Sequence, residues 1–110
     1  MIMEQVICIK EATELCDGDQ EFMKEMVRVM REDIISCQNL LAKAFMENNT
    51  VQVREVAHRV KGQAAMLAAK DLNEKSKTVE DAAKVVACTK TEYLLLMLSM
   101  NKFVQCTRDT

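Results

Sequence analysis

The chain has 110 residues, 49% of them hydrophobic, and a formal net charge of −2. This length and hydrophobic content are enough for one domain with its own core. Charges of both signs are interspersed along the chain, which excludes a basic patch for nucleic acid or a polybasic arm for membranes. No apolar run reaches the roughly 18 residues of a membrane span, and the first ten residues include Glu4 and do not resemble a signal peptide. We therefore expect a cytoplasmic protein with no nucleic-acid or membrane partner.

The composition favours helix throughout, because the chain has no proline and only two glycines. Residues 4–16 are predicted to form a short helix or a partly ordered lead-in, which ends in the turn CDGDQ, residues 16–20. Asp19 is a good N-cap for a long helix predicted over residues 20–47. Its expected apolar stripe recurs at steps of three and four residues and comprises Phe22, Met26, Val29, Met30, Ile34, Cys37, Leu41, Ala44 and Phe45.

Two further helices are predicted over residues 51–69 and 71–87. Asn49 or Thr50 can cap the first of them, and if Asn49 is the cap, Gln52 occupies the capping-box position. The inward residues of the first are Val53, Val56, Ala57, Val60, Ala64 and Leu67. Those of the second are Leu72, Ser76, Val79, Ala83 and Val86.

Thr89 and Glu92 fit a T-x-x-E capping box, which predicts a last helix over residues 90–105. Its apolar side comprises Tyr93, Leu96, Met97, Met100, Phe103 and Val104, and Leu94, Leu95 and Leu98 widen it, so we expect this helix to be the most buried. Four amphipathic helices joined by short loops predict an all-α fold, an antiparallel four-helix bundle with a short extra N-terminal helix. We expect a single domain over residues 1–110, and a monomer, because the bundle needs no partner to close.

The five cysteines are odd in number and irregularly spaced, and no two form a C-x-x-C pair. This pattern disfavours a disulfide framework and a zinc site. We interpret them as reduced thiols, several packed as small apolar core residues. With a single histidine in the chain, a metal or haem site is the least favoured alternative, and we expect this domain to bind no metal and no cofactor.

The stretch AHRVKGQ, residues 57–63, contains the only histidine, His58, and one of the two glycines, Gly62. Helical phase places both on a polar face with Lys61. Helical side chains lean toward the N-terminus, so a bulky residue at position 62 would cover the imidazole. Glycine leaves the ring bare, at about 1 kcal/mol of helix stability. The Lys61 ammonium would favour a neutral, nucleophilic ring and would pair with a phosphoryl group carried by it.

Residues 57–72, AHRVKGQAAMLAAKDL, resemble the pattern A-H-x-L-K-G-x-[SA]-x-x-L-G-A-x-x-L around the phosphorylated histidine of histidine-containing phosphotransfer (HPt) domains. Residues 14–30 and 40–58 resemble the family's opening and its approach to the histidine. The resemblance implies reversible phosphorylation of His58, usually at Nε2, with Lys61 as the phosphoryl-stabilising cation and Gly62 as the access-clearing residue. Ala64 replaces a frequent serine. Ala68 stands where the family commonly has glycine, so we expect this helix to end differently or to run longer.

The resemblance implies a phosphorelay intermediate that accepts a phosphoryl group on His58 from a receiver-domain aspartate, or from a kinase, and passes it to another receiver aspartate. Its partners would be receiver domains of response regulators and hybrid histidine kinases. The receiver would supply Mg²⁺, so no independent catalytic machinery is expected in this chain. Around His58 we expect a partner-docking patch that comprises Val51, Arg54, Arg59, Ala65 and Ala69.

Two alternatives share this fold. One is the phosphoacceptor domain of a larger chemotaxis-type or hybrid histidine kinase, although the initial methionine and the lack of a trailing linker favour a stand-alone protein. The other is a helical adaptor that carries no phosphate, and such an adaptor has no reason to retain Gly62.

Overall fold

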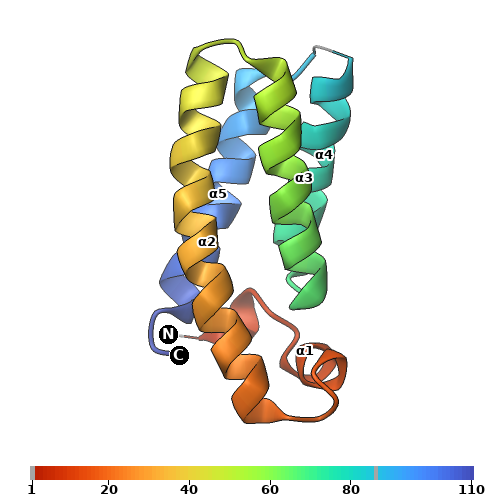
Figure 1. Cartoon of the computed structure of the whole chain (residues 1–110), viewed down its shortest axis with the longest axis vertical. Coiled ribbons are helices and arrows are strands. Elements are labelled where there is room, and N and C mark those ends of the chain that lie inside the picture. The colour runs from red at the N-terminus through yellow and green to blue at the C-terminus, as the bar shows by residue number, and fades with distance from the viewer. Residues whose placement is uncertain (1, 86) are drawn as a thin grey trace.

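The computed structural model of the chain describes residues 2–85 and 87–110, and all its regular elements there are helices (Figure 1). This confirms the predicted all-α fold. The elements are η1 (Met3–Gln5), α1 (Ile9–Leu15), α2 (Gln20–Met46), α3 (Thr50–Met66), α4 (Lys70–Lys84) and α5 (Lys90–Thr107).

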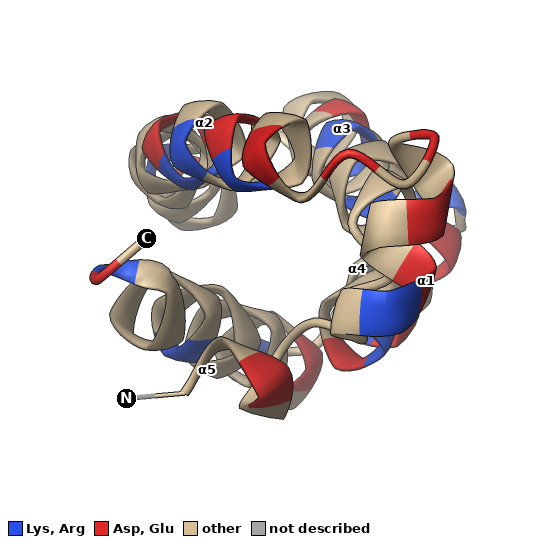
Figure 2. Cartoon of the chain, turned by 90° about the horizontal axis from the view of Figure 1, so that it is seen from below, with Lys and Arg blue, Asp and Glu red and all other residues tan. Residues whose placement is uncertain are grey.

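The four long helices run alternately up and down, and the two chain ends lie close together at one end of the bundle (Figure 1). Seen end-on, α2, α3, α4 and α5 surround the core in chain order, and the charged residues colour their outer faces (Figure 2). The α3 helix packs most extensively against α4. Short α1 lies across one end of the bundle, next to the start of α2.

The inward stripe of α2 follows a regular alternation of three- and four-residue steps. Its buried members are Met23, Val27, Met30, Ile34, Cys37, Leu41 and Ala44. The predicted stripe was wrong at its start, because Phe22 and Val29 are 52% and 61% exposed. Burial raises the pKa of the Cys37 thiol to about 11, which keeps it protonated in the core.

The stripe predicted for α3 is confirmed in full, since all six of its residues are buried. In α4, the described members of the predicted stripe are also buried, whereas the expected Val86 lies outside the described residues. Helix α5 has the largest share of buried residues among the four long helices, as predicted. The three leucines that were expected to widen its buried face do not do so, because Leu94, Leu95 and Leu98 are 45%, 44% and 64% exposed.

The predicted helix caps are present. Asp19 Oδ1 accepts a bond from the Phe22 N–H at 2.9 Å, and Asn49, rather than Thr50, accepts one from the Gln52 N–H at 3.1 Å. Thr89 and Glu92 form both halves of the predicted capping box, at 3.2 and 2.8 Å. These bonds satisfy amide groups that have no partner within their own helix.

The predicted short N-terminal helix is present as α1, but it does not extend over residues 4–16, because the segment divides into η1 and α1. Between them Ile7 is buried and the Cys8 N–H donates to the Ala68 carbonyl at 3.1 Å. In a continuous helix this N–H would instead donate to the backbone carbonyl four residues earlier in the same helix. The turn between α3 and α4 therefore interrupts the N-terminal segment.

The expected change at the end of α3 is also wrong. Helix α3 ends at Met66, Ala68 adopts φ 52°, and the Ala69 N–H returns to the Ala64 carbonyl at 2.8 Å. This is the Schellman ending that glycine usually provides. Ala68 makes the same turn, but the left-handed backbone conformation is strained for a residue that carries a Cβ.

Helix α4 ends at Lys84, earlier than the predicted residue 87. All five cysteines are free, and each is buried or half-buried. In the part of the chain that the structure describes, no helix is both long and apolar enough to cross a membrane.

Candidate functional site

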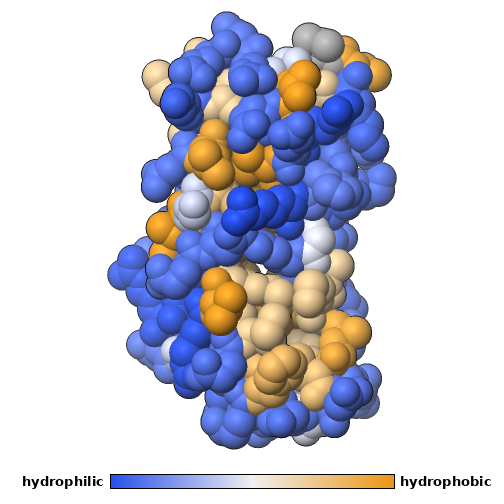
Figure 3. Space-filling model, viewed as in Figure 1, coloured by the Kyte–Doolittle hydropathy of each residue, from blue (hydrophilic) through white to orange (hydrophobic). Residues whose placement is uncertain are grey.

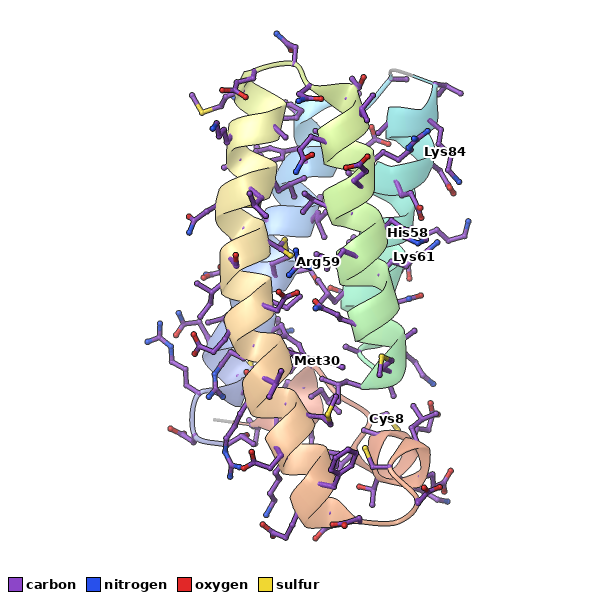
Figure 4. All side chains as sticks on the ribbon, viewed as in Figure 1. Cys8, Met30, His58, Arg59, Lys61 and Lys84 are labelled. Atoms are coloured by element: carbon purple, nitrogen blue, oxygen red, sulfur yellow. The ribbon has the colours of Figure 1, made fainter. Side chains whose placement is uncertain are left out.

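His58 lies midway along α3, and its side chain is 69% exposed, as the helical phase predicts. The inward neighbours Ala57 and Val60 are fully buried and fix the rotation of α3 against the core. His58 and Lys61 lie on the side of α3 that faces α4, and Lys84 is the last residue of α4 (Figure 4). The imidazole is thus a surface group held on a rigid, well-packed helix.

One nitrogen of the ring has a partner on the neighbouring helix. Glu80 of α4 places Oε2 2.6 Å from His58 Nδ1. A carboxylate oxygen accepts a hydrogen bond, so Nδ1 carries the proton that it donates. In the neutral ring the lone pair then belongs to Nε2, which is the nitrogen that the family resemblance designates for phosphorylation.

Glu80 also binds Lys61. Its side chain is only 5% exposed, and Oε1 lies 2.6 Å from Lys61 Nζ. Burial opposes ionisation of Glu80, but pairing with Lys61 and with His58 outweighs it, so the pKa of Glu80 is lowered. We expected the Lys61 ammonium to act directly on the imidazole. In the structure the ionised carboxylate of Glu80 lies between them and contacts both groups.

Gly62 is exposed, and neither its backbone nor its surroundings require glycine. Its φ is not positive, and a Cβ added there would meet no atom within 4 Å. Glycine is unfavourable in a helix interior. The chain's own backbone and packing thus give no reason for glycine here, and its role in access stays a prediction.

A hollow of about 350 Å³ opens beside the ring and is lined by Arg54, Glu55, His58, Glu80 and Lys84. Two cations thus border the same open space as the imidazole. Arg54 was expected there, whereas Lys84 was not. Such a setting can hold a dianionic group by charge while leaving it accessible to a partner.

Arg59 lies on the other side of α3. Its Nε donates to Asp33 Oδ2 of α2 at 2.9 Å, a second nitrogen reaches Oδ1, and Gln63 also donates to this carboxylate (Figure 4). The cluster joins α2 to α3. It directs the Arg59 charge away from His58, although half of the side chain stays exposed at 51%.

The predicted docking patch is partly wrong. Val51, Arg54 and Ala65 are exposed and continue along α3 on either side of His58 and Gly62. Ala69 is completely buried, because the chain turns inward after Ala68. Ala69 therefore cannot contact a partner.

Beyond Ala65, the exposed face continues into an apolar surface that the sequence analysis missed. Exposed side chains of Leu15, Phe22 and Met66 line a hollow of about 210 Å³ together with Cys16, Met26, Met30 and Leu67. Figure 3 shows this apolar area on the lower half of the molecule, over α1, α2 and the end of α3. We call it the apolar hollow.

Glu80 is the main site residue that sequence reasoning missed. It lies 22 positions after His58, so no local spacing links them. One signal was present, because Glu80 falls between Ser76 and Ala83 on the inward edge of the α4 stripe. A buried acid requires a cationic or hydrogen-bonding partner, and α3 supplies both.

Among the described residues, no three His, Cys, Asp or Glu side chains come together in the manner of a metal site. The fold and the site define a helical-bundle domain that presents one histidine to solvent, with its Nδ1 bound and its Nε2 free.

Comparison with known families agrees with this description. The model of the Hpt domain family matches residues 25–100, and the chain belongs to this family. In general terms its role is therefore histidine phosphotransfer in a phosphorelay. Searches of curated proteins and of solved structures found no match.

Proposed function

We propose that this protein is a phosphorelay intermediate that carries a phosphoryl group on Nε2 of His58. It accepts the group from a receiver-domain aspartate, or from a kinase, and passes it to another receiver aspartate. The observation that supports this most is the hydrogen bond between His58 Nδ1 and Glu80, on a ring that is 69% exposed. It leaves Nε2 as the nitrogen with a free lone pair.

Charge around the ring suits the transferred group. A phosphoryl group on Nε2 would enter the hollow bordered by Arg54 and Lys84, and Lys61 lies one turn away on the same face. Phosphoryl transfer depends mainly on positioning and on neutralising charge. This domain supplies the positioned nucleophile and cations, and the receiver supplies the aspartate and Mg²⁺.

The partner is a receiver domain that docks over the exposed face of α3. Val51, Arg54, Gly62 and Ala65 lie on this face, and Gly62 leaves room above the imidazole. We extend the proposed docking patch to the apolar hollow, which begins directly after Ala65 at Met66. Met side chains there can adapt to more than one partner surface.

The proposal is tested by mixing the protein with a receiver domain phosphorylated on aspartate. We expect an acid-labile, base-stable phosphate on this chain and none on His58→Gln. Labelling that survives His58→Gln would contradict the site. If no receiver labels the chain, although the receivers label a known HPt domain, the adaptor alternative replaces this proposal.

A further inference from the structure

One carboxylate, that of Glu55, borders the space beside His58 that would receive the phosphoryl group. Glu55 belongs to α3 and is exposed. It lines the hollow of about 350 Å³ together with Arg54, His58, Glu80 and Lys84. Glu55 comes three residues before His58, and side chains at this spacing are neighbours on a helix surface. A negative charge is unfavourable beside a dianion, so a carboxylate at this place requires an explanation.

Two carboxylates on the neighbouring part of α4 differ from Glu55, because each has a cationic partner. Glu80 pairs with Lys61 at 2.6 Å, and Asp81 pairs with Lys77 at 2.8 Å. Glu55 forms no ion pair with any residue that the structure describes. Its charge is therefore not neutralised by a direct contact, and it can act on a group that enters the hollow.

We propose that Glu55 sets the equilibrium of phosphoryl transfer, because its carboxylate repels a phosphoryl group on Nε2 of His58 and so shifts the group toward the receiver. This inference rests on the proposed function and concerns the same site. It gives Glu55 an effect opposite to that of Arg54 and Lys84, the two cations that border the same hollow. The balance between these charges then determines how readily the chain passes the group on.

Glu55 takes no part in making or breaking bonds. When the group leaves, the Nε2–P bond breaks and its electron pair stays on Nε2, while an oxygen of the receiver aspartate forms the new O–P bond. The proton on Nδ1 is present before and after this step, so the ring changes from a cation to a neutral imidazole. Because the phosphoryl dianion projects from Nε2 into the hollow that Glu55 lines, we expect its repulsion to outweigh the attraction between Glu55 and the cationic ring.

The size of the effect follows from Coulomb's law. For a carboxylate about 6 Å from the phosphoryl group, in surroundings between bulk water and a protein surface, repulsion changes the equilibrium constant about three- to tenfold. Salt screens exposed charges, since the Debye length falls from about 10 Å at 0.1 M to about 3 Å at 1 M ionic strength. The effect of Glu55 should therefore shrink as the salt concentration rises, which a purely steric effect would not do.

The experiment measures phosphoryl transfer in both directions between the full chain and a receiver domain. The ratio of the two second-order rate constants is the equilibrium constant between the free proteins, so a change in docking that affects both directions equally cancels. For Glu55→Gln at 0.1 M salt, we expect this ratio to shift about three- to tenfold toward phosphorylated His58. At 1 M salt the variant and wild type should differ by less than about twofold. Glutamine retains the size and helix propensity of this exposed side chain, so we expect the variant to fold.

Two control variants separate the charge at this position from charge in general. Glu32→Gln on α2 removes an exposed carboxylate that also forms no ion pair with a described residue, but Glu32 does not line the hollow. Glu55→Asp keeps a negative charge in the hollow. We expect both variants to stay within about twofold of the wild-type ratio.

Three results would overturn the inference while leaving the proposed function intact. One is a wild-type ratio for Glu55→Gln at 0.1 M salt. The second is an equal shift in Glu32→Gln or in Glu55→Asp, and the third is a shift in Glu55→Gln that persists at 1 M salt. If wild type exchanges no phosphoryl group with receivers that label a known HPt domain, the proposed function fails and the inference fails with it.

Discussion

Gly62 is the residue whose identity the chain itself does not explain. Replacing it with glutamine should raise the free energy of unfolding by up to about 1 kcal/mol, because helix propensity improves and a side chain has open space there. The same change should slow transfer from a receiver on the order of 100-fold, since the side chain leans across His58 and displaces the partner. Denaturant unfolding and rapid-quench transfer assays measure the two effects.

Gly62→Ala is the matched control for this prediction. It improves helix propensity at least as much but adds only a methyl group, so we expect similar stabilisation and a smaller loss of rate. If Gly62→Gln transfers as fast as wild type, the access argument is wrong.

At the site, His58, Lys61 and Gly62 could be identified from sequence because they share one helix face, and a period of 3.6 residues fixes that relation. Glu80 and Lys84 could not, because they come from α4, and the register of α4 against α3 depends on packing over the whole interface. Arg59 illustrates the same limit. Its neighbours in sequence placed it near His58, whereas Asp33 on α2 directs it elsewhere.

At the scale of elements, the turn that ends α3 contains a residue type that disfavours the backbone conformation of this turn. Among the residues that the structure describes, three non-glycine residues have positive φ, namely Asp17, Asn48 and Ala68. Asn and Asp tolerate this conformation, whereas alanine is strained by roughly 1–2 kcal/mol. Ala68→Gly removes that strain, partly offset by a lost methyl group and by greater freedom in the unfolded chain.

We therefore expect Ala68→Gly to increase the free energy of unfolding by about 0.5–1 kcal/mol, measured by urea unfolding. Asn48→Gly, at the equivalent point after α2, should gain less. A destabilised Ala68→Gly would contradict the strain assigned to this turn.

The helices themselves were predictable because side-chain caps and apolar periodicity are local signals. Thr89 with Glu92 and Asp19 determine where α5 and α2 begin. The division of the N-terminal segment was not predictable, because it depends on a bond from Cys8 to Ala68, which is 60 positions away. The outward position of Leu98 likewise depends on which side of α5 its neighbours occupy.

At the scale of the whole molecule, the docking surface that we propose for a receiver joins the exposed face of α3 to the apolar hollow. Phe22→Glu tests it, because Phe22 is 52% exposed in the hollow and an acid in the first turn of α2 does not weaken the helix. We expect the receiver concentration for half-maximal transfer to rise about tenfold. Phosphorylation by phosphoramidate should be unchanged, since a small donor needs no docking surface.

Leu98→Glu on α5 is the control for Phe22→Glu. It places the same charge on a similarly exposed apolar residue, 64% exposed, on a helix that does not line the apolar hollow. We expect normal transfer from this variant. Equal weakening by both changes would mean that the apolar hollow is not a docking surface.

The central claim is that His58 carries a phosphoryl group on Nε2 because Glu80 occupies Nδ1. The most direct measurement is ³¹P–¹⁵N correlation NMR of the ¹⁵N-labelled chain after phosphorylation by a receiver domain. The account predicts one phosphorus signal coupled to Nε2 of His58, with a proton still on Nδ1. Coupling to Nδ1, or phosphate on any residue other than His58, would contradict it.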